Sequence, residues 1–305
     1  MAIATGTATS HTDLFAKLRA FLKLSTGSGG PGWTERNYDG SGLQMLFVAP
    51  GLSGTEEIGV GLSLHSSVSD DAYNLGCWMY RAYNAALAYT NQPGSSVRMY
   101  HLLWNQPMTY WFIANGQRVI IVTKVSTVYT ASYLGKILIR SLPGDYPQPY
   151  YVGTQSLSSN TRWSTPSFSH RNFWDPGDAA TILSAAGTWV PVRNFLQSSS
   201  ESQETTRVNI WPFSAGSVDG GYVVTDRYRE LRENLDGTYS PLPLEIMGGN
   251  ALADEEIYGE LDGAFAVTGF SAGSEDTASI GGEDHMFVQD IARTARYNYA
   301  MVRLA

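Results

Sequence analysis

The stretch from Thr109 to Val125 constrains the fold of this chain more than any other. In it, two runs of β-branched and aromatic residues flank the dipeptide Asn115-Gly116. That dipeptide favours the positive φ angles of a type I′ turn, so the stretch predicts a β-hairpin with a two-residue loop. Within its first strand Trp111 and Phe112 point to opposite faces, and both faces are apolar. We therefore expect both faces to be covered, by the rest of the chain or by another subunit.

Further segments with strand-like patterns occur along the chain. Together with an N-terminal helix they predict an α+β protein, mainly β, with antiparallel sheets in a β-sandwich-like arrangement. Tyr73–Leu87 fits a strand or a buried helix equally well. The other expected strands are Trp33–Tyr38, Leu43–Ala49, Ile58–Leu64, Met108–Ala114, Arg118–Val128, Tyr133–Ile139, Gly263–Phe270, His285–Asp290 and Tyr297–Leu304.

Two segments have helical patterns. A short amphipathic helix is expected over about residues 12–24, where an apolar residue recurs at every third or fourth position. Its apolar face would be formed by Leu14, Leu18, Phe21 and Leu22. Asp178–Ala186 is a second, shorter candidate.

The serine-rich stretch 156–165 is the expected domain boundary. It would separate a helix-plus-β domain, residues 1–155, from a second β-rich domain, residues 156–305. The alternative is that both parts form one compact unit.

The composition is unusual in its charge. Charged residues make up 16% of the 305 residues, below the roughly 25% typical of soluble domains. The only lysines are Lys17, Lys23, Lys124 and Lys136, whereas the chain has 18 tyrosines and 8 tryptophans. Protein interfaces exclude lysine and are enriched in Tyr, Trp and Arg. This composition is expected of a chain whose surface is largely buried against neighbours, although an ordinary β-rich enzyme with a neutral surface is the alternative.

Several classes of function are disfavoured by the sequence. The formal net charge is −8 and there is no basic run, so we expect no nucleic-acid partner. Cys77 is the only cysteine, which excludes an internal disulfide and a cysteine-based zinc site. No apolar stretch approaches the roughly 18 residues of a membrane span, and no signal peptide is evident. We expect a protein made and folded in a cytosol, without a membrane partner.

Two motifs resemble catalytic signatures. Gly269–Gly273 matches the nucleophile-elbow pattern Gly-x-Ser-x-Gly, with Ser271 at its centre. The elbow requires a strand that turns into a helix, but no helical pattern follows, and His285 comes too soon to be the base on a separate loop. We expect a hairpin loop, and no catalytic role for Ser271 or His285. Gly281–Asp284 is similar to the Gly-Gly-Asp/Glu-Glu hairpin of diguanylate cyclases, and a simple turn is expected there.

No metal, cofactor or catalytic site is expected from the remaining polar residues. The histidines His11, His65, His101, His170 and His285 are dispersed, and the acidic residues Asp70, Asp71 and Asp254–Glu256 lack the alternating ligands of a calcium loop. A carboxylate pair for glycoside hydrolysis, formed only in space, stays open. Six tryptophans could form a platform for sugars, although core packing and subunit contacts explain them more simply. They are Trp104, Trp111, Trp163, Trp174, Trp189 and Trp211.

Several stretches, in the same order along the chain, resemble a family of virion structural proteins of tailed bacteriophages. The similarity is weakest over residues 155–255. The stretches are Thr5–Thr9, Asp13–Leu18, Gly32–Thr34, Trp111–Arg118, Lys124–Tyr129, Tyr133–Gly135, Tyr146–Tyr150, Tyr258–Gly263, Val267–Phe270 and Arg293–Arg296.

The resemblance implies a non-enzymatic component of the particle, in the tail, neck or baseplate, and gives no catalytic residues. We expect the chain to form a symmetric ring or collar with other copies of itself and with neighbouring phage structural proteins, in a virion assembled in the bacterial cytoplasm. Its contacts should bury well over about 1,000 Å² per subunit. The alternative is a carbohydrate-binding or carbohydrate-cleaving protein at the tail tip. A carboxylate pair in an aromatic-lined cleft would favour this alternative.

Overall fold

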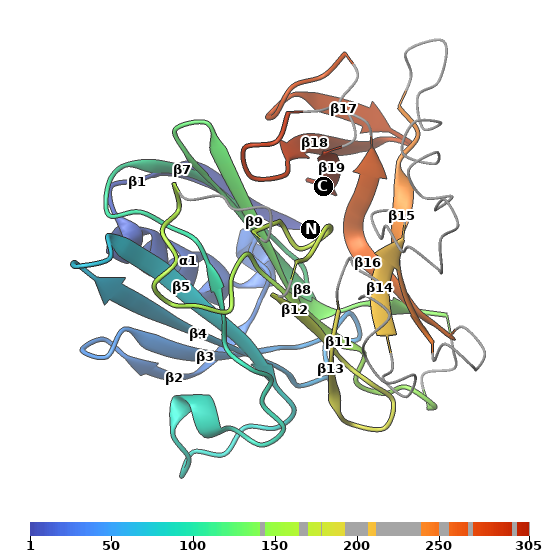
Figure 1. The fold of residues 1–305 in the computed structure, drawn as a ribbon. Coiled ribbons are helices and arrows are strands. Elements are labelled where there is room, and N and C mark those ends of the chain that lie inside the picture. The colour runs from blue at the N-terminus through green and yellow to red at the C-terminus, as the bar shows by residue number, and fades with distance from the viewer. Residues whose placement is uncertain are drawn as a thin grey trace, which may run out of the picture.

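The structure is a computed structural model that describes residues 1–140, 144–164, 170–177, 179–192, 207–211, 239–249, 256–267, 271–294 and 298–304. Three antiparallel β-sheets lie in layers: an N-terminal sheet, a central sheet and a C-terminal sheet (Figure 1). A helix packs between the N-terminal and central sheets. The predicted class, mainly β with antiparallel sheets and one short N-terminal helix, is confirmed. Among the helices described, none has the length and hydropathy needed to cross a lipid bilayer.

The central sheet contains seven strands and is apolar on both faces. In order across the sheet, its strands are β1 (Ala2–Ala8), β7 (Met108–Ala114), β8 (Arg118–Val125), β9 (Val128–Lys136), β11 (Tyr150–Gly153), β12 (Ala180–Leu183) and β13 (Trp189–Pro191). Because β12 and β13 follow residue 156 in the sequence, this sheet spans the expected domain boundary.

The N-terminal sheet covers one face of the central sheet. Its strands, in order, are β2 (Thr34–Asp39), β3 (Gln44–Ala49), β4 (Ile58–Ser67), β5 (Ala72–Tyr80) and β6 (Met99–His101). The ambiguous Tyr73–Leu87 segment is therefore a strand, which ends at Tyr80. Two single-turn 3₁₀ helices, Thr26–Ser28 and Tyr89–Asn91, lie in the connections.

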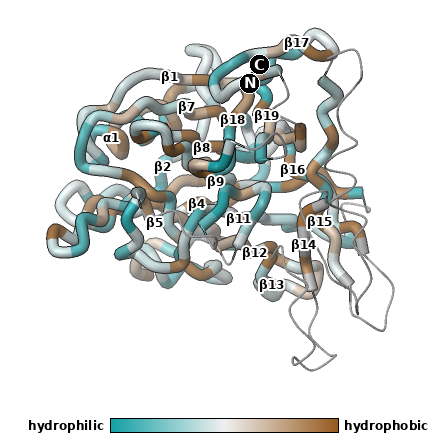
Figure 2. The backbone as a smooth tube through the Cα atoms, turned by 45° about the horizontal axis from the view of Figure 1, so that its top comes forward, coloured by the Kyte–Doolittle hydropathy of each residue, from teal (hydrophilic) through white to brown (hydrophobic). Residues whose placement is uncertain are grey.

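The C-terminal sheet covers the opposite face of the central sheet. Its strands, in order, are β14 (Arg207–Trp211), β15 (Leu242–Gly249), β16 (Glu256–Val267), β19 (Tyr299–Arg303), β18 (Glu283–Gln289) and β17 (Thr277–Ile280), and β10 (Leu138–Ile139) pairs with β16. Two large hydrophobic cores lie between the three layers, one on each face of the central sheet. Figure 2 shows hydrophobic stretches along the central strands β7 and β8.

The predicted hairpin is present as β7 and β8, in the interior of the central sheet. Phe112 packs in the core that faces the helix and the N-terminal sheet, whereas Trp111 packs in the core that faces the C-terminal sheet. Their exposed fractions are 0% and 9%. Both faces of the hairpin are thus covered by the chain itself, and its apolar character does not require another subunit.

The predicted type I′ turn at Asn115-Gly116 is wrong, because neither residue has a positive φ. The Asn115 amide donates to the carbonyl of Arg118, at 3.1 Å. The side-chain oxygen of Asn115 accepts hydrogen bonds from the amides of Gln117 and Arg118, at 2.9 and 3.0 Å. This Asx-type bonding stabilises the turn without positive φ. The expected conformation occurs instead at Gly281-Gly282, the turn between β17 and β18, where φ is 64° and 86°.

The helix α1 spans His11–Lys23, close to the predicted range, and the four predicted apolar side chains are buried. Its N-cap is Ser10, whose hydroxyl accepts from the amide of Asp13 at 3.2 Å. The Asp13 carboxylate in turn accepts from the amide of Thr9 at 2.8 Å. This reciprocal arrangement resembles a capping box and defines the start of the helix.

Two other segments differ from expectation. The helix expected at Asp178–Ala186 is wrong, since the segment contains β12, which pairs with β11 and β13. Tertiary pairing in a sheet buried on both faces overrides a weak helical pattern. The strand β1 was not expected. The β-branched residues Ile3, Thr5 and Thr7 alternate in it only with alanine and glycine, which are depleted in strands, so the strand pattern is weak.

Candidate functional site

The serine of the elbow-like motif does not lie in an elbow. Ser271 has a φ of 62°, but a turn and the strand β17 follow it rather than a helix. His285 lies in β18, where its Nδ1 is 2.9 Å from the carbonyl oxygen of Glu283 and its ring contacts Phe265. Within the part of the chain that the structure describes, no hydrogen bond joins Ser271 to His285. The absence of a catalytic role for the two residues stays a prediction.

His101 is the most deeply buried histidine and was not singled out by the sequence. Its Nδ1 lies 2.7 Å from the hydroxyl of Ser132, and its Nε2 lies 2.9 Å from that of Thr123. The hydroxyl of Thr130 completes the group. Burial lowers the pKa of His101 to about 3. The ring is therefore neutral and joins β6 of the N-terminal sheet to β8 and β9 of the central sheet.

Metal-binding clusters are not found among the described residues: no three His, Cys, Asp or Glu side chains come together. His11 bonds to Asn105 and Ser66, and His65 bonds to Asn160. Of the acidic residues considered as calcium ligands, Asp70 accepts from Ser67 and Asp71 pairs with Arg162. Asp254 and Glu255, and the side chain of Glu256, lie outside the described part of the chain.

A carboxylate pair does form in space, between Asp175 and Asp290. Arg171 pairs with both, and Arg293 pairs with Asp290 at 2.9 Å. The amide of Asn172 donates to Asp290 at 2.7 Å. Burial and the nearby Asp175 carboxylate raise the pKa of Asp290, against the opposing effects of Arg293, Asn172 and Arg171.

This pair is poorly placed for glycoside hydrolysis. The exposed fractions of Asp175 and Asp290 are 2% and 0%, so neither carboxylate is accessible to a sugar ring. A glycosidase needs its two carboxyl groups on either side of an accessible glycosidic bond. The cluster instead connects the loop before β12 to the end of β18, and thus the central sheet to the C-terminal sheet.

A second polar cluster surrounds Asp262 in β16. One carboxylate oxygen accepts from the side chains of Asn115, Gln117 and Arg118, at 2.7, 3.2 and 3.3 Å. The other accepts from Arg303 at 2.9 Å. Burial acts to raise the pKa of Asp262, but the two arginines and the two side-chain amides outweigh it and hold the pKa below its usual range.

The turn between β7 and β8 also contacts the N-terminal layer. The indole nitrogen of Trp33, which precedes β2, donates to the carbonyl of Asn115 at 2.8 Å. A Cβ atom on Gly116 would overlap the carbonyl oxygen of Gly51. Glycine is required at position 116 because of this close approach and not because of its φ.

The tryptophans do not form one platform. Trp111 and Trp174 are buried in the core that faces the C-terminal sheet. Trp104 and Trp163 contact each other, with ring centroids 5.1 Å apart, and both pack against the other core. Trp189 donates to the carbonyl of Gly94, and the side chain of Trp211 is outside the described part. The pattern agrees with core packing rather than with a flat sugar-binding surface.

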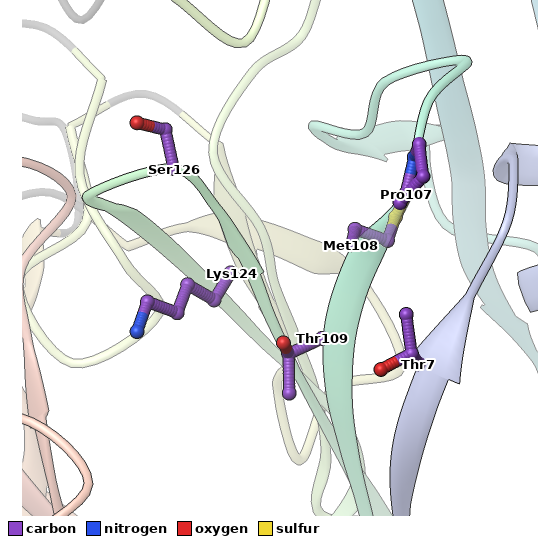
Figure 3. A pocket seen from close by; sticks show the side chains of 6 residues that line it. All are labelled: Thr7, Pro107, Met108, Thr109, Lys124 and Ser126. Carbon is purple, nitrogen blue, oxygen red and sulfur yellow. The ribbon is translucent and has the colours of Figure 1, made fainter.

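A small surface pocket of about 200 Å³ lies beside β1, β7 and β8 (Figure 3). Its size is below the roughly 300 Å³ at which small-molecule sites begin. The ammonium of Lys124 points away from Thr7 and pairs with Glu275 at 2.5 Å. No charged group is thus left to orient a ligand there. The lining residues are Thr7, Pro107, Met108, Thr109, Lys124 and Ser126.

The accessible feature with most potential for binding is the outer edge of β1. This strand ends the central sheet and lies at its outer margin, beyond β7 (Figure 1). Its seven residues carry no charge and no proline, and its pairing with β7 is regular throughout. The exposed fraction of Ile3 is 43%, and Thr5 and Thr7 are also exposed. An exposed, regular, uncharged edge strand is able to pair with a strand of another chain.

The sequence was also compared with known proteins. No protein-family model matches the chain, and no curated protein shows significant similarity to it.

Proposed function

We propose that the protein is a non-enzymatic structural component of a tailed-phage particle, which assembles with copies of itself into a ring or collar in the neck, tail or baseplate. Two independent lines support the proposal. The first is the resemblance of the stretches described above to virion structural proteins. The second is the composition of the chain, which is poor in charged residues and in lysine.

The observation that carries the proposal concerns the lysines. Each of the four is held in an ion pair within the chain. The pairs are Lys17–Asp13, Lys23–Glu35, Lys124–Glu275 and Lys136–Glu56. Exposed ion pairs of this kind add little to the stability of the fold. They matter here for the burial of the surface in a contact between subunits. They leave no lysine ammonium without an anionic partner, and an unpaired ammonium is a costly group to bury in an interface.

The layered fold determines where such contacts would form. Both faces of the central sheet are covered within the subunit, so the hairpin faces cannot serve as an interface. Contacts between copies would therefore use sheet edges and connecting loops. The exposed apolar residues Leu52, Val68 and Val97 lie in such loops.

The test is the assembly state of the purified protein. Light scattering after size-exclusion chromatography should give a multiple of 33.3 kDa, and negative-stain images should show a closed symmetric object. A glycan array probed with the same sample distinguishes the carbohydrate-binding alternative. A protein that stays monomeric at every concentration and binds a glycan would contradict the proposal.

A further inference from the structure

The outward-facing backbone groups of β1 can be identified from the sheet register. The amide of Asn115 donates to Arg118, so the backbone groups of Asn115 face β8. Along an antiparallel strand these groups alternate in direction, and those of Phe112 and Ala114 therefore face β1. Their partners in β1 are Ala4 and Ala2.

It follows that the even-numbered residues of β1 bond to β7, whereas Ile3, Thr5 and Thr7 direct their amides and carbonyls outward. A contact supports this assignment: the Lys17 ammonium, which lies outside the sheet, donates to the carbonyl of Thr7 at 3.1 Å. No other hydrogen bond to the outward groups of these three residues occurs within the described chain. The edge therefore offers five unpaired backbone groups in a row.

The other sheet edges whose side chains the structure describes are protected. The strand β2 carries Glu35, Arg36 and Asp39, and its register with β3 is irregular after Glu35. The strand β13 has three residues and ends in Pro191. The edges β6 and β17 are only three and four residues long. Charge, proline, irregularity and short length are the usual protections against edge pairing, and β1 has none of them.

We propose that β1 pairs antiparallel with β1 of a second copy of this chain, so that two central sheets join across a two-fold axis. The inference rests on the proposed function and gives one contact between its copies. Because a two-fold contact closes on itself, a ring of more than two copies would join β1-paired dimers through a second contact. With the axis at Thr5, this residue exchanges two hydrogen bonds with Thr5 of the partner subunit. Ile3 exchanges two with the partner's Thr7, and Thr7 exchanges two with the partner's Ile3. The carbonyl of Thr7 accepts its new bond beside or in place of the one from Lys17.

A second copy fits this edge for two reasons. A two-fold axis places each side chain near its own counterpart, and an uncharged strand brings no like charges together. The exposed side chains also match in pairs, since a threonine lies opposite a threonine at the centre and Ile3 lies opposite the methyl group of Thr7 at each end. Such pairs of β-branched residues stabilise antiparallel strands. Addition of a strand to an exposed edge is an established mode of association.

The direct test uses two variants at one position. Thr5→Pro removes an amide that points outward and takes no part in the subunit's own sheet, and proline is tolerated at such a position. It should weaken self-association at least about tenfold, as measured by sedimentation velocity, because two symmetric donors are lost. Thr5→Val keeps the amide and should associate like the wild type. If Thr5→Pro does not fold, Thr5→Lys, which places two ammonium groups together at the axis, takes its place.

A crosslinking experiment tests the register. Under mild oxidation Thr5→Cys should form a disulfide-linked dimer, because the two Cα atoms would lie about 5.5 Å apart. Thr7→Cys alone should not, since its counterpart is Ile3, whereas the double variant Ile3→Cys/Thr7→Cys should. The native Cys77 is buried and does not interfere.

The outcomes separate this inference from the proposed function. Wild-type association in Thr5→Pro, or equal crosslinking by Thr5→Cys and Thr7→Cys, would overturn the pairing of β1. If such a variant still assembles and enters particles, the structural role stands and only the interface is wrong. If the wild-type protein is monomeric and absent from particles, both proposals fail.

Discussion

The side-chain amide of Asn115, in the turn between β7 and β8, donates a 2.7 Å hydrogen bond to the carboxylate of Asp262 in β16. The two residues are 147 positions apart in the sequence. Asn115 also stabilises its own turn through its side-chain oxygen, and its carbonyl accepts from Trp33. One residue thus connects all three layers.

Replacement of Asn115 by aspartate tests this connection. Asn115→Asp keeps an acceptor for the turn but loses the donor and places a second carboxylate beside Asp262. We expect the free energy of unfolding to fall by about 2–3 kcal/mol. Urea denaturation measures it. Asn115→Ala is the comparison: it loses the turn acceptor as well, but brings no charge. If Asn115→Asp is as stable as the wild type, the contact with Asp262 is not important.

A pair of glycine substitutions separates two reasons for the presence of glycine. In Gly116→Ala the new methyl group overlaps the carbonyl of Gly51, and the backbone must move. In Gly281→Ala the methyl group meets no atom within 4 Å, and only the positive φ is unfavourable. We expect losses of about 2–3 kcal/mol and about 1 kcal/mol respectively. Equal losses in thermal and urea unfolding would contradict the close approach of the two loops.

His101 should make the fold sensitive to acid. Burial lowers its pKa to about 3 in the folded chain, whereas the unfolded chain binds a proton near the ordinary value of 6.5. Between these values the unfolded state binds more protons, so this contribution to stability is complete above pH 6.5 and is lost as the pH falls. The slope approaches about 1.4 kcal/mol per pH unit.

The measurement compares the wild type with His101→Gln in urea at several pH values from about 7 to about 4. The variant is expected to be less stable at pH 7, because the cage of hydroxyl groups is disturbed. Its stability should nevertheless fall less steeply towards low pH. Parallel curves would show that His101 is not buried in its neutral form.

The serine of the elbow-like motif should be unreactive. No helix follows Ser271, and His285 bonds to Glu283 rather than to the serine. A fluorophosphonate probe should leave Ser271 unlabelled, as judged by peptide mass spectrometry. Labelling that disappears in His285→Ala would establish a nucleophile and overturn the structural role.

Features set by local pattern were predictable from the sequence, and features set by distant contacts were not. The apolar period of α1 and the β-branched runs of β7 and β8 depend on near neighbours. The conformation at Asn115 was mispredicted because its side chain bonds to its own turn and to a distant strand. The polar partners of His101 and Asp290 come from separate strands and loops, so no spacing in the sequence predicts these two clusters. β1 is a strand because β7 pairs with it.

The copy number of this protein in purified phage particles tests the structural role most directly. Quantitative mass spectrometry of particles from a phage that encodes the chain should find it in a fixed, small number per particle, as a ring or collar requires. Its absence from purified particles, while it is abundant in the infected cell, would contradict the proposed function.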